Sequence, residues 1–156
     1  MLFRSVELVN EYAKEVTWGE RFKILEDQLY IMAKQNHKLW RLKGKVDWVI
    51  TDSPIPLGII YTNLADYGPS FPNLVMEVFN QYENFNFLLN RNFVYNPVGR
   101  NQKDEGEAKI FDQKVTNLLD AWQVPFKIIT AGETAVDTIM KDVVHKSINK
   151  QLMLDL

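Results

Sequence analysis

The hydrophobic pattern alternates between short apolar runs and longer stretches in which apolar residues recur every three or four positions. Short runs rich in β-branched and aromatic residues predict strands, and the periodic stretches predict amphipathic helices. The predicted strands cover residues 3–9, 46–50, 85–89 and 125–130, with a turn at 10–14 after the first. The predicted helices cover residues 20–42, 57–67, 73–82 and 103–122, and a last helix follows Gly132. This alternation predicts an α/β fold with a mainly parallel sheet in three layers.

The run from Val46 to Ile50 is the most strand-like stretch of the chain. It is nearly all apolar and is bounded by Gly44 before it and by Ser53-Pro54 after it. We expect a strand buried on both faces, of the kind found in parallel sheets covered by helices. Asp52 follows at the carboxyl end, where open α/β sheets bind their ligands. The alternative is that Asp52 caps the turn or the next helix.

Other polar side chains follow neighbouring predicted strands. Glu11 follows the first strand, on the edge expected for Asp52, and the polar loop 90–102 after the third strand carries Arg91 and Arg100. Carboxylates hold Mg²⁺ or accept a hydroxyl proton, and arginines neutralise phosphate oxygens, so this set suits the transfer of an anionic group. The alternative for the two arginines is that they are solvated loop cations.

Composition narrows the class of protein. The chain has 156 residues, of which 46% are hydrophobic, which predicts one globular domain over residues 1–156. A net charge of −2 argues against a nucleic-acid partner, and the absence of cysteine excludes a disulfide framework and favours an intracellular setting. No apolar run approaches a membrane span in length. His37 and His145 lack metal-ligand spacing and are interpreted as surface residues.

Four blocks in this order resemble a known family. They are Leu-Val-Asn-Glu-Tyr-Ala-Lys at 8–14, Leu-Glu-Asp-Gln-Leu-Tyr at 25–30, Val-Asp-Trp-Val-Ile-Thr-Asp-Ser-Pro at 46–54, and Tyr-Asn-Pro-Val-Gly-Arg-Asn-Gln at 95–102. Together they resemble the phage branch of the AAA-type P-loop ATPases related to the nicotinamide riboside kinase domain of NadR. The resemblance extends over residues 6–144, which is nearly the entire chain.

This resemblance implies a P-loop kinase fold and an ATP-dependent phosphotransferase that uses Mg²⁺ in the cytoplasm of a bacterial host. Asp52 would lie near the magnesium ion, and Glu11 would face the phosphoryl acceptor as its base. Arg91 and Arg100 would bind the transferred phosphate from a lid at about 91–102. Tyr12 and Gln28 are further candidates for contact with a small nucleoside, nucleotide or nicotinamide riboside-like acceptor.

The chain departs from the family at the phosphate-binding signature. No Gly-x-x-x-x-Gly-Lys-Ser/Thr precedes the first predicted strand. Two neighbouring elements of the family are missing with this signature: the strand in the middle of the family's sheet and the helix that follows it. Either the sequence is an incomplete reading frame, or it is a shortened relative that binds a ligand without hydrolysing ATP. The second alternative predicts a non-catalytic interaction module, in which the incomplete sheet pairs with a partner or with a second copy.

Overall fold

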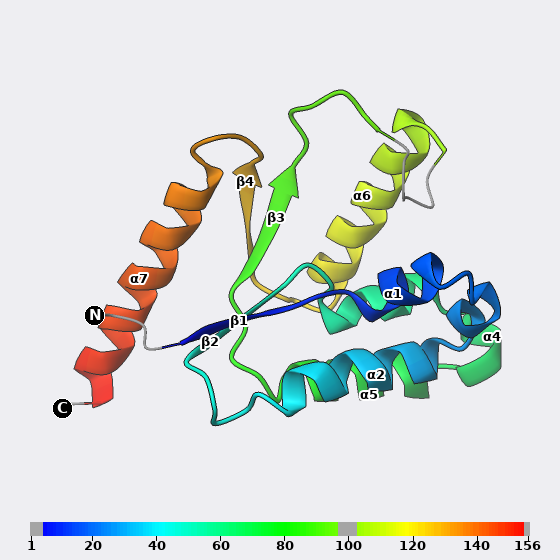
Figure 1. Ribbon diagram of the computed structural model, residues 1–156, viewed down its shortest axis with the longest axis horizontal. Coiled ribbons are helices and arrows are strands. Elements are labelled where there is room, and N and C mark those ends of the chain that lie inside the picture. The colour runs from blue at the N-terminus through cyan, green and yellow to red at the C-terminus, as the bar shows by residue number, and fades with distance from the viewer. Residues whose placement is uncertain (1–4, 97–102, 155–156) are drawn as a thin grey trace. The chain divides into compact units, whose positions relative to one another are not determined.

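The computed structural model describes residues 5–96 and 103–154 (Figure 1). Contacts divide the chain into two compact units, Met1–Glu83 and Asn84–Leu156, which are considered in turn. Each unit combines helices with one pair of parallel strands. The prediction of a mixed α/β chain with parallel strands is therefore confirmed.

The first unit contains most of the short helices. In chain order its elements are β1 (Val6–Val9), α1 (Tyr12–Trp18), the 3₁₀ helix η1 (Phe22–Glu26), α2 (Gln28–Trp40), β2 (Trp48–Thr51), the 3₁₀ helix η2 (Ile55–Leu57), α3 (Gly58–Tyr61), α4 (Leu64–Tyr67) and α5 (Ser70–Phe79). Strands β1 and β2 are parallel, with Val6 opposite Trp48 and Val9 opposite Thr51. The strand ends that precede Glu11 and Asp52 are therefore neighbours.

The sequence predictions for residues 10–14 and 20–42 are wrong. Residues 10–14 are not a turn, because α1 begins at Tyr12 and buries Val16 completely. The helix predicted over 20–42 is divided, because the Asp27 side chain accepts a hydrogen bond of 2.9 Å from the backbone N–H of Tyr30. This cap starts α2 at Gln28 and leaves the upstream apolar residues in η1.

The core of the first unit lies around α5, which packs against α2 (Figure 1). Phe71, Val75, Met76 and Phe79 recur at helical spacing on α5 and are each no more than 6% exposed. Ile31 and Met32 on α2 are also buried. Burial of one apolar stripe per helix is the main source of stability for helices this short.

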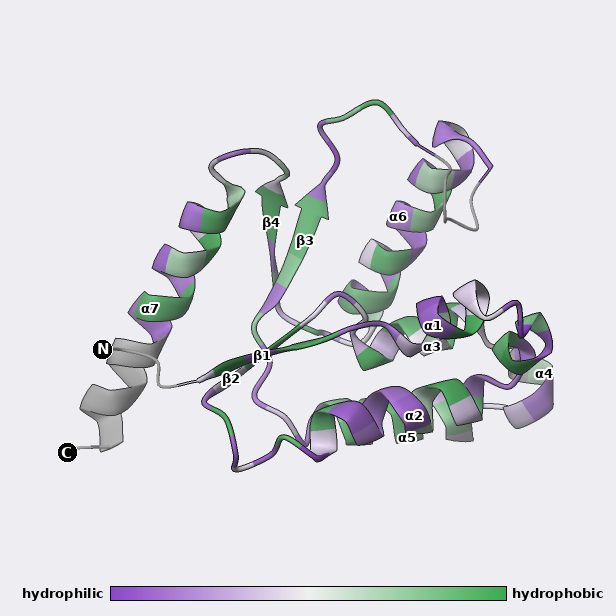
Figure 2. Cartoon of the chain, viewed as in Figure 1, coloured by the Kyte–Doolittle hydropathy of each residue, from purple (hydrophilic) through white to green (hydrophobic). Residues whose placement is uncertain are grey.

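One face of the β1–β2 pair is apolar and uncovered. Val6, Leu8 and Ile50 are 48%, 64% and 58% exposed, and they share a face because Leu8 and Ile50 are register partners and side chains alternate along a strand. Figure 2 shows both strands as largely hydrophobic. On the opposite face Val9 is only 4% exposed. The prediction of a strand buried on both faces is therefore wrong for β2.

The second unit contains β3 (Asn86–Asn90), α6 (Glu105–Ala121), β4 (Phe126–Thr130) and α7 (Ala135–Leu154). Strands β3 and β4 are parallel, with Asn86 opposite Phe126 and Asn90 opposite Thr130. Its buried apolar side chains include Ala108, Val124, Ile129 and Ala135. Within the described ranges, the predicted single sheet takes the form of two separate two-stranded sheets.

Candidate functional site

Glu11 and Asp52 lie together at the carboxyl ends of β1 and β2. Val9 and Thr51, the last residues of the two strands, are register partners in the parallel pair. Glu11 is two residues beyond the first and Asp52 is one beyond the second. The structure thus brings these two predicted site residues to one edge of the sheet.

The negative charge of Asp52 acts on Glu11. The pKa of Glu11 is raised above its ordinary value, first by burial of the half-buried side chain and then by the negative charge of Asp52, while Lys14 acts in the opposite direction. Asp52 itself is exposed. A carboxylate with increased basicity beside an exposed carboxylate can accept a proton while its neighbour binds a cation.

Gln35 holds the two strand-end loops in place. Gln35 is only 4% exposed, and its Oε1 accepts a hydrogen bond of 2.9 Å from the backbone N–H of Tyr12. Through Nε2 it donates to Thr51 Oγ1 over 3.4 Å, and the same hydroxyl accepts from the Ser53 N–H at 3.2 Å. One buried amide therefore connects the residue after Glu11 to the residue before Asp52.

The remaining candidates of the first unit, Tyr12 and Gln28, have different surroundings. The Tyr12 hydroxyl donates to the Tyr30 hydroxyl at 3.4 Å, on the exposed surface of α1 and α2. Gln28 is 7% exposed, and its Nε2 donates to the Leu25 carbonyl at 2.7 Å. Gln28 therefore stabilises the junction between η1 and α2. For both Tyr12 and Gln28, contact with a substrate stays a prediction.

Arg91 belongs to the second unit and already has protein partners there. Its Nη2 donates to Asp112 Oδ1 at 2.5 Å and to the Ala108 carbonyl at 3.3 Å, and its guanidinium carbon lies 5.6 Å from the centre of the Tyr95 ring. Binding of a phosphate by Arg91 would require exchange of the Asp112 carboxylate for the ligand. Arg100 and the second half of the predicted lid, residues 97–102, lie outside the described residues.

The side chains at the strand ends can be compared with the ligands that Mg²⁺ needs. Among the described residues there is no group of three or more His, Cys, Asp or Glu that could hold a metal ion. Mg²⁺ is commonly bound through one or two carboxylates, with waters and substrate phosphates completing its coordination. The exposed Asp52 is one carboxylate of the kind that such a site uses.

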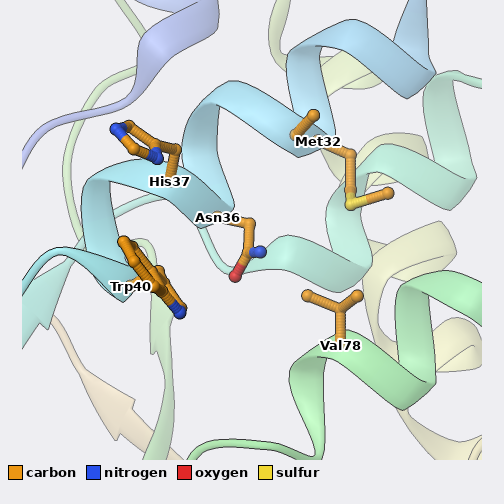
Figure 3. Close-up of a pocket in the computed structure, with 6 residues that line it drawn as sticks. Met32, Asn36, His37, Trp40 and Val78 are labelled. Atoms are coloured by element: carbon orange, nitrogen blue, oxygen red, sulfur yellow. The ribbon is translucent and has the colours of Figure 1, made fainter. Parts of the chain in front are cut away.

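A recess that neither Glu11 nor Asp52 lines lies between α2 and α5. Figure 3 shows Met32 and Asn36 of α2 and Val78 of α5 directed toward one another, with Trp40 at one end. The His37 and Trp40 rings stack with 6.0 Å between their centres, and Asn36 Oδ1 accepts a hydrogen bond of 2.7 Å from the Tyr82 hydroxyl. The lining is mainly apolar, and it contains no pair of acid and base groups that resembles the pair at the strand ends.

No protein-family model, curated protein or solved structure matches this chain. In the part of the chain that the structure describes, no helix has both the length and the apolar character needed to cross a membrane.

Two residues of α2 near the candidate residue Tyr12 were not singled out by the sequence: Tyr30, whose hydroxyl accepts a hydrogen bond from that of Tyr12, and Lys34, whose Nζ lies 5.4 Å from the centre of the Tyr30 ring. Their neighbourhood depends on the packing of α1 against α2, which places Tyr12 and Tyr30 together although they are 18 residues apart. The helical spacing of Tyr30 and Lys34 was the only available signal, and it does not identify the partner helix.

Proposed function

We propose that this chain is part of an ATP-dependent phosphotransferase that acts on a nucleoside, nucleotide or nicotinamide riboside-type small molecule. The observation that supports the proposal is the pair of carboxylates at the ends of two adjacent parallel strands, one of them with a raised pKa. Ligands of open α/β sheets bind at this edge.

In this proposal the two carboxylates have different roles. Glu11 accepts the proton of the acceptor hydroxyl, because its burial and the neighbouring Asp52 increase its basicity. The exposed Asp52 contributes to binding of Mg²⁺, and the ion, when bound, neutralises charge on the nucleotide phosphates. Arg91 and Arg100 bind the transferred phosphoryl group from the lid.

The strand pairing is compatible with the finer fold that the resemblance implies. In the three-layer P-loop kinase sheet, the phosphate-binding strand lies in the middle. A sheet without that strand consists of two parallel pairs, and the described residues form two parallel pairs. We therefore propose that the 156 residues alone do not transfer a phosphoryl group, because no phosphate-binding signature Gly-x-x-x-x-Gly-Lys-Ser/Thr occurs among them.

The test is a phosphoryl-transfer assay with Mg-ATP on the protein expressed from its full reading frame. Asp52→Asn should lower turnover at least about 100-fold, and Glu11→Gln by roughly 10²- to 10⁴-fold, with circular dichroism unchanged. Asp66→Asn, on the exposed surface of α4, is the matched control and should retain full turnover. Unchanged turnover in Asp52→Asn would contradict the proposal.

A second candidate function is favoured by the exposed apolar face of β1 and β2. A non-catalytic module could pair its sheet with a strand from a partner or from a second copy, and Val6, Leu8 and Ile50 would then be covered. This function predicts a stable oligomer of the chain in light scattering. A well-folded monomer would count against it.

A further inference from the structure

Helix α2 and the turn that follows it carry an excess of positive charge. Between Gln28 and Val46 the chain has five Lys or Arg and no Asp or Glu, although its overall net charge is −2. The five cations are Lys34, Lys38, Arg41, Lys43 and Lys45, and all but Lys38 are exposed. We call these residues the α2 basic surface. The net charge of the whole chain therefore conceals a local basic region.

Most of the α2 basic surface is not neutralised by carboxylates. Lys38 forms an ion pair with Glu15, whereas the other four members form none within the described residues. The first acid after the surface, Asp47, accepts a backbone hydrogen bond of 2.9 Å. A helix dipole favours cations in the last turn of a helix, but Lys43 and Lys45 lie beyond the end of α2. Helix stability alone therefore does not account for the cluster.

An exposed aromatic pair lies among these cations. Trp40, the last residue of α2, is 59% exposed, and the His37 ring stacks with it at 6.0 Å between ring centres and 21° between ring planes. Figure 3 shows Trp40 at one end of the mainly apolar recess between α2 and α5, which has a volume of about 430 Å³. A large ring that is more than half exposed beside such a recess can stack against a planar group of a ligand.

The spacing along α2 places charges and ring on the outward side of the helix. Residues three, four and seven positions apart share a helix face, and this spacing joins Lys34, His37, Lys38 and Arg41. The opposite face packs into the core, where Ile31 and Gln35 are buried. Figure 2 shows hydrophilic residues along the side of α2 that faces the viewer. Trp40, between Arg41 in sequence and His37 in its stack, belongs to the same outward side.

We propose that the α2 basic surface binds single-stranded nucleic acid, with phosphates at the cations and a base stacked on Trp40. A row of cations beside an exposed aromatic ring is the combination that binds single strands without sequence preference. A duplex keeps its bases stacked on one another and would leave the ring unused. An anionic membrane requires an apolar face for insertion, whereas the outward side of α2 is mainly polar (Figure 2). The proposal does not require the chain to transfer a phosphoryl group.

The first experiment is fluorescence anisotropy of the 156-residue chain with a fluorescein-labelled single strand of thymidines, a duplex of equal length and phosphatidylglycerol vesicles. We expect saturable binding of the single strand and weaker binding of the duplex. With three or four phosphate contacts, the affinity for the single strand should fall roughly 20- to 50-fold between 50 and 200 mM salt. No saturable binding of the single strand up to about 100 μM protein would overturn the proposal. Equal or tighter binding of the duplex, or binding of the vesicles alone, would also overturn it.

Two tryptophan variants test the stacking contact. Trp40→Ala should weaken binding of the single strand about tenfold, because one base loses the ring on which it stacks. Trp40→Phe keeps an aromatic ring and should lose less. Trp18→Ala is the matched control, since Trp18 of α1 is 77% exposed and lies outside the α2 basic surface, and it should bind like the native protein.

Two double variants test the charges. Arg41→Gln with Lys45→Gln should weaken binding about tenfold and reduce the slope of log affinity against log salt by about 1.4, because two phosphate contacts are lost. Lys23→Gln with Lys114→Gln removes the same charge from exposed positions elsewhere and should leave affinity and slope unchanged. Native affinity in both Trp40→Ala and the Arg41 and Lys45 double variant, with circular dichroism unchanged, would contradict the proposal.

Discussion

Gln35 is the residue on which the geometry of the candidate site depends most. A buried side-chain amide must satisfy its donors and acceptors within the protein, and Gln35 does so with Tyr12 and Thr51. Tyr12 directly follows Glu11 in the chain, and Thr51 directly precedes Asp52. The spacing between the two carboxylates is therefore coupled to one hydrogen-bonded side chain of α2.

Replacement of this amide should destabilise the protein. Gln35→Ala leaves the Tyr12 N–H without its acceptor in a partly buried position, and we expect a loss of about 1–3 kcal/mol in the free energy of unfolding. Urea unfolding followed by circular dichroism measures this loss. Gln113→Ala, on the exposed face of α6, is the matched control and should change the free energy by no more than about 0.5 kcal/mol. Equal effects in both variants would contradict the role of Gln35.

Glu11 makes stability depend on pH. Because its pKa in the folded protein lies above the ordinary value of 4.5, the folded state binds this proton more tightly than the unfolded chain does. Its stabilising contribution is present below the ordinary pKa and is lost as the pH rises through the raised folded pKa. Glu11→Gln should therefore show a smaller fall in the free energy of unfolding between about pH 4 and about pH 7. An equally steep fall in the variant would show that other groups cause it.

The sequence predicted some of these residues and missed others for a physical reason. Glu11 and Asp52 were predicted because each follows a strand, and parallel strands end at one edge. Gln35, Tyr30 and Lys34 lie on a helix whose rotation about its axis depends on contacts with α1. Those contacts join residues 18 and 23 positions apart, and no local pattern encodes them.

At the level of elements, helix starts depend on single capping residues. Asp104 precedes α6 and accepts a hydrogen bond of 2.9 Å from the Glu107 N–H, while Glu107 accepts one of 2.8 Å from the Lys103 N–H. Gly106 leaves room for this arrangement, since a Cβ at that position would lie 3.2 Å from Asp104 Oδ1. Apolar spacing alone predicted the bounds of α6 within two residues. The cap at Asp27 was missed, so the helix predicted over 20–42 began well before Gln28.

Removal of the cap should weaken α6. Asp104→Ala is expected to lower the free energy of unfolding by about 1 kcal/mol, because the Glu107 N–H loses its partner. Asp120→Ala provides an internal control, since it removes a negative charge from the last turn of the same helix, where the helix dipole disfavours it. That variant should be neutral or slightly more stable. Thermal unfolding of both variants measures the difference, and a loss in Asp120→Ala equal to that in Asp104→Ala would contradict the capping role.

At the level of the whole molecule, large buried side chains are unevenly divided. Those of the first unit include Phe71, Val75, Met76 and Phe79, whereas those described for the second unit are Ala108, Val124, Ile129 and Ala135 and include no aromatic side chain. The hydrophobic pattern predicted the alternation of strands and helices. It did not predict this division, because the two strand pairs have the same apolar character in sequence.

Unequal cores should give unequal local stability. We expect the backbone amides of α5 to exchange with deuterium at least about fivefold more slowly than those of β4, which corresponds to about 1 kcal/mol in opening free energy. Exchange followed by mass spectrometry at neutral pH measures both. Protection of β4 equal to or greater than that of α5 would contradict this expectation.

The parallel pairing of both sheets also determines the order of events during synthesis. A parallel pair cannot be joined by a tight hairpin. Pairing of β1 with β2 is therefore possible only after α1, η1, α2 and β2 have left the ribosome. The same holds for β3 and β4, which are separated by α6. Since each pair lies within one unit, the first can complete its pairing while the second is still being translated. In each unit the strand pair can therefore form only after the helices between its two strands have been translated.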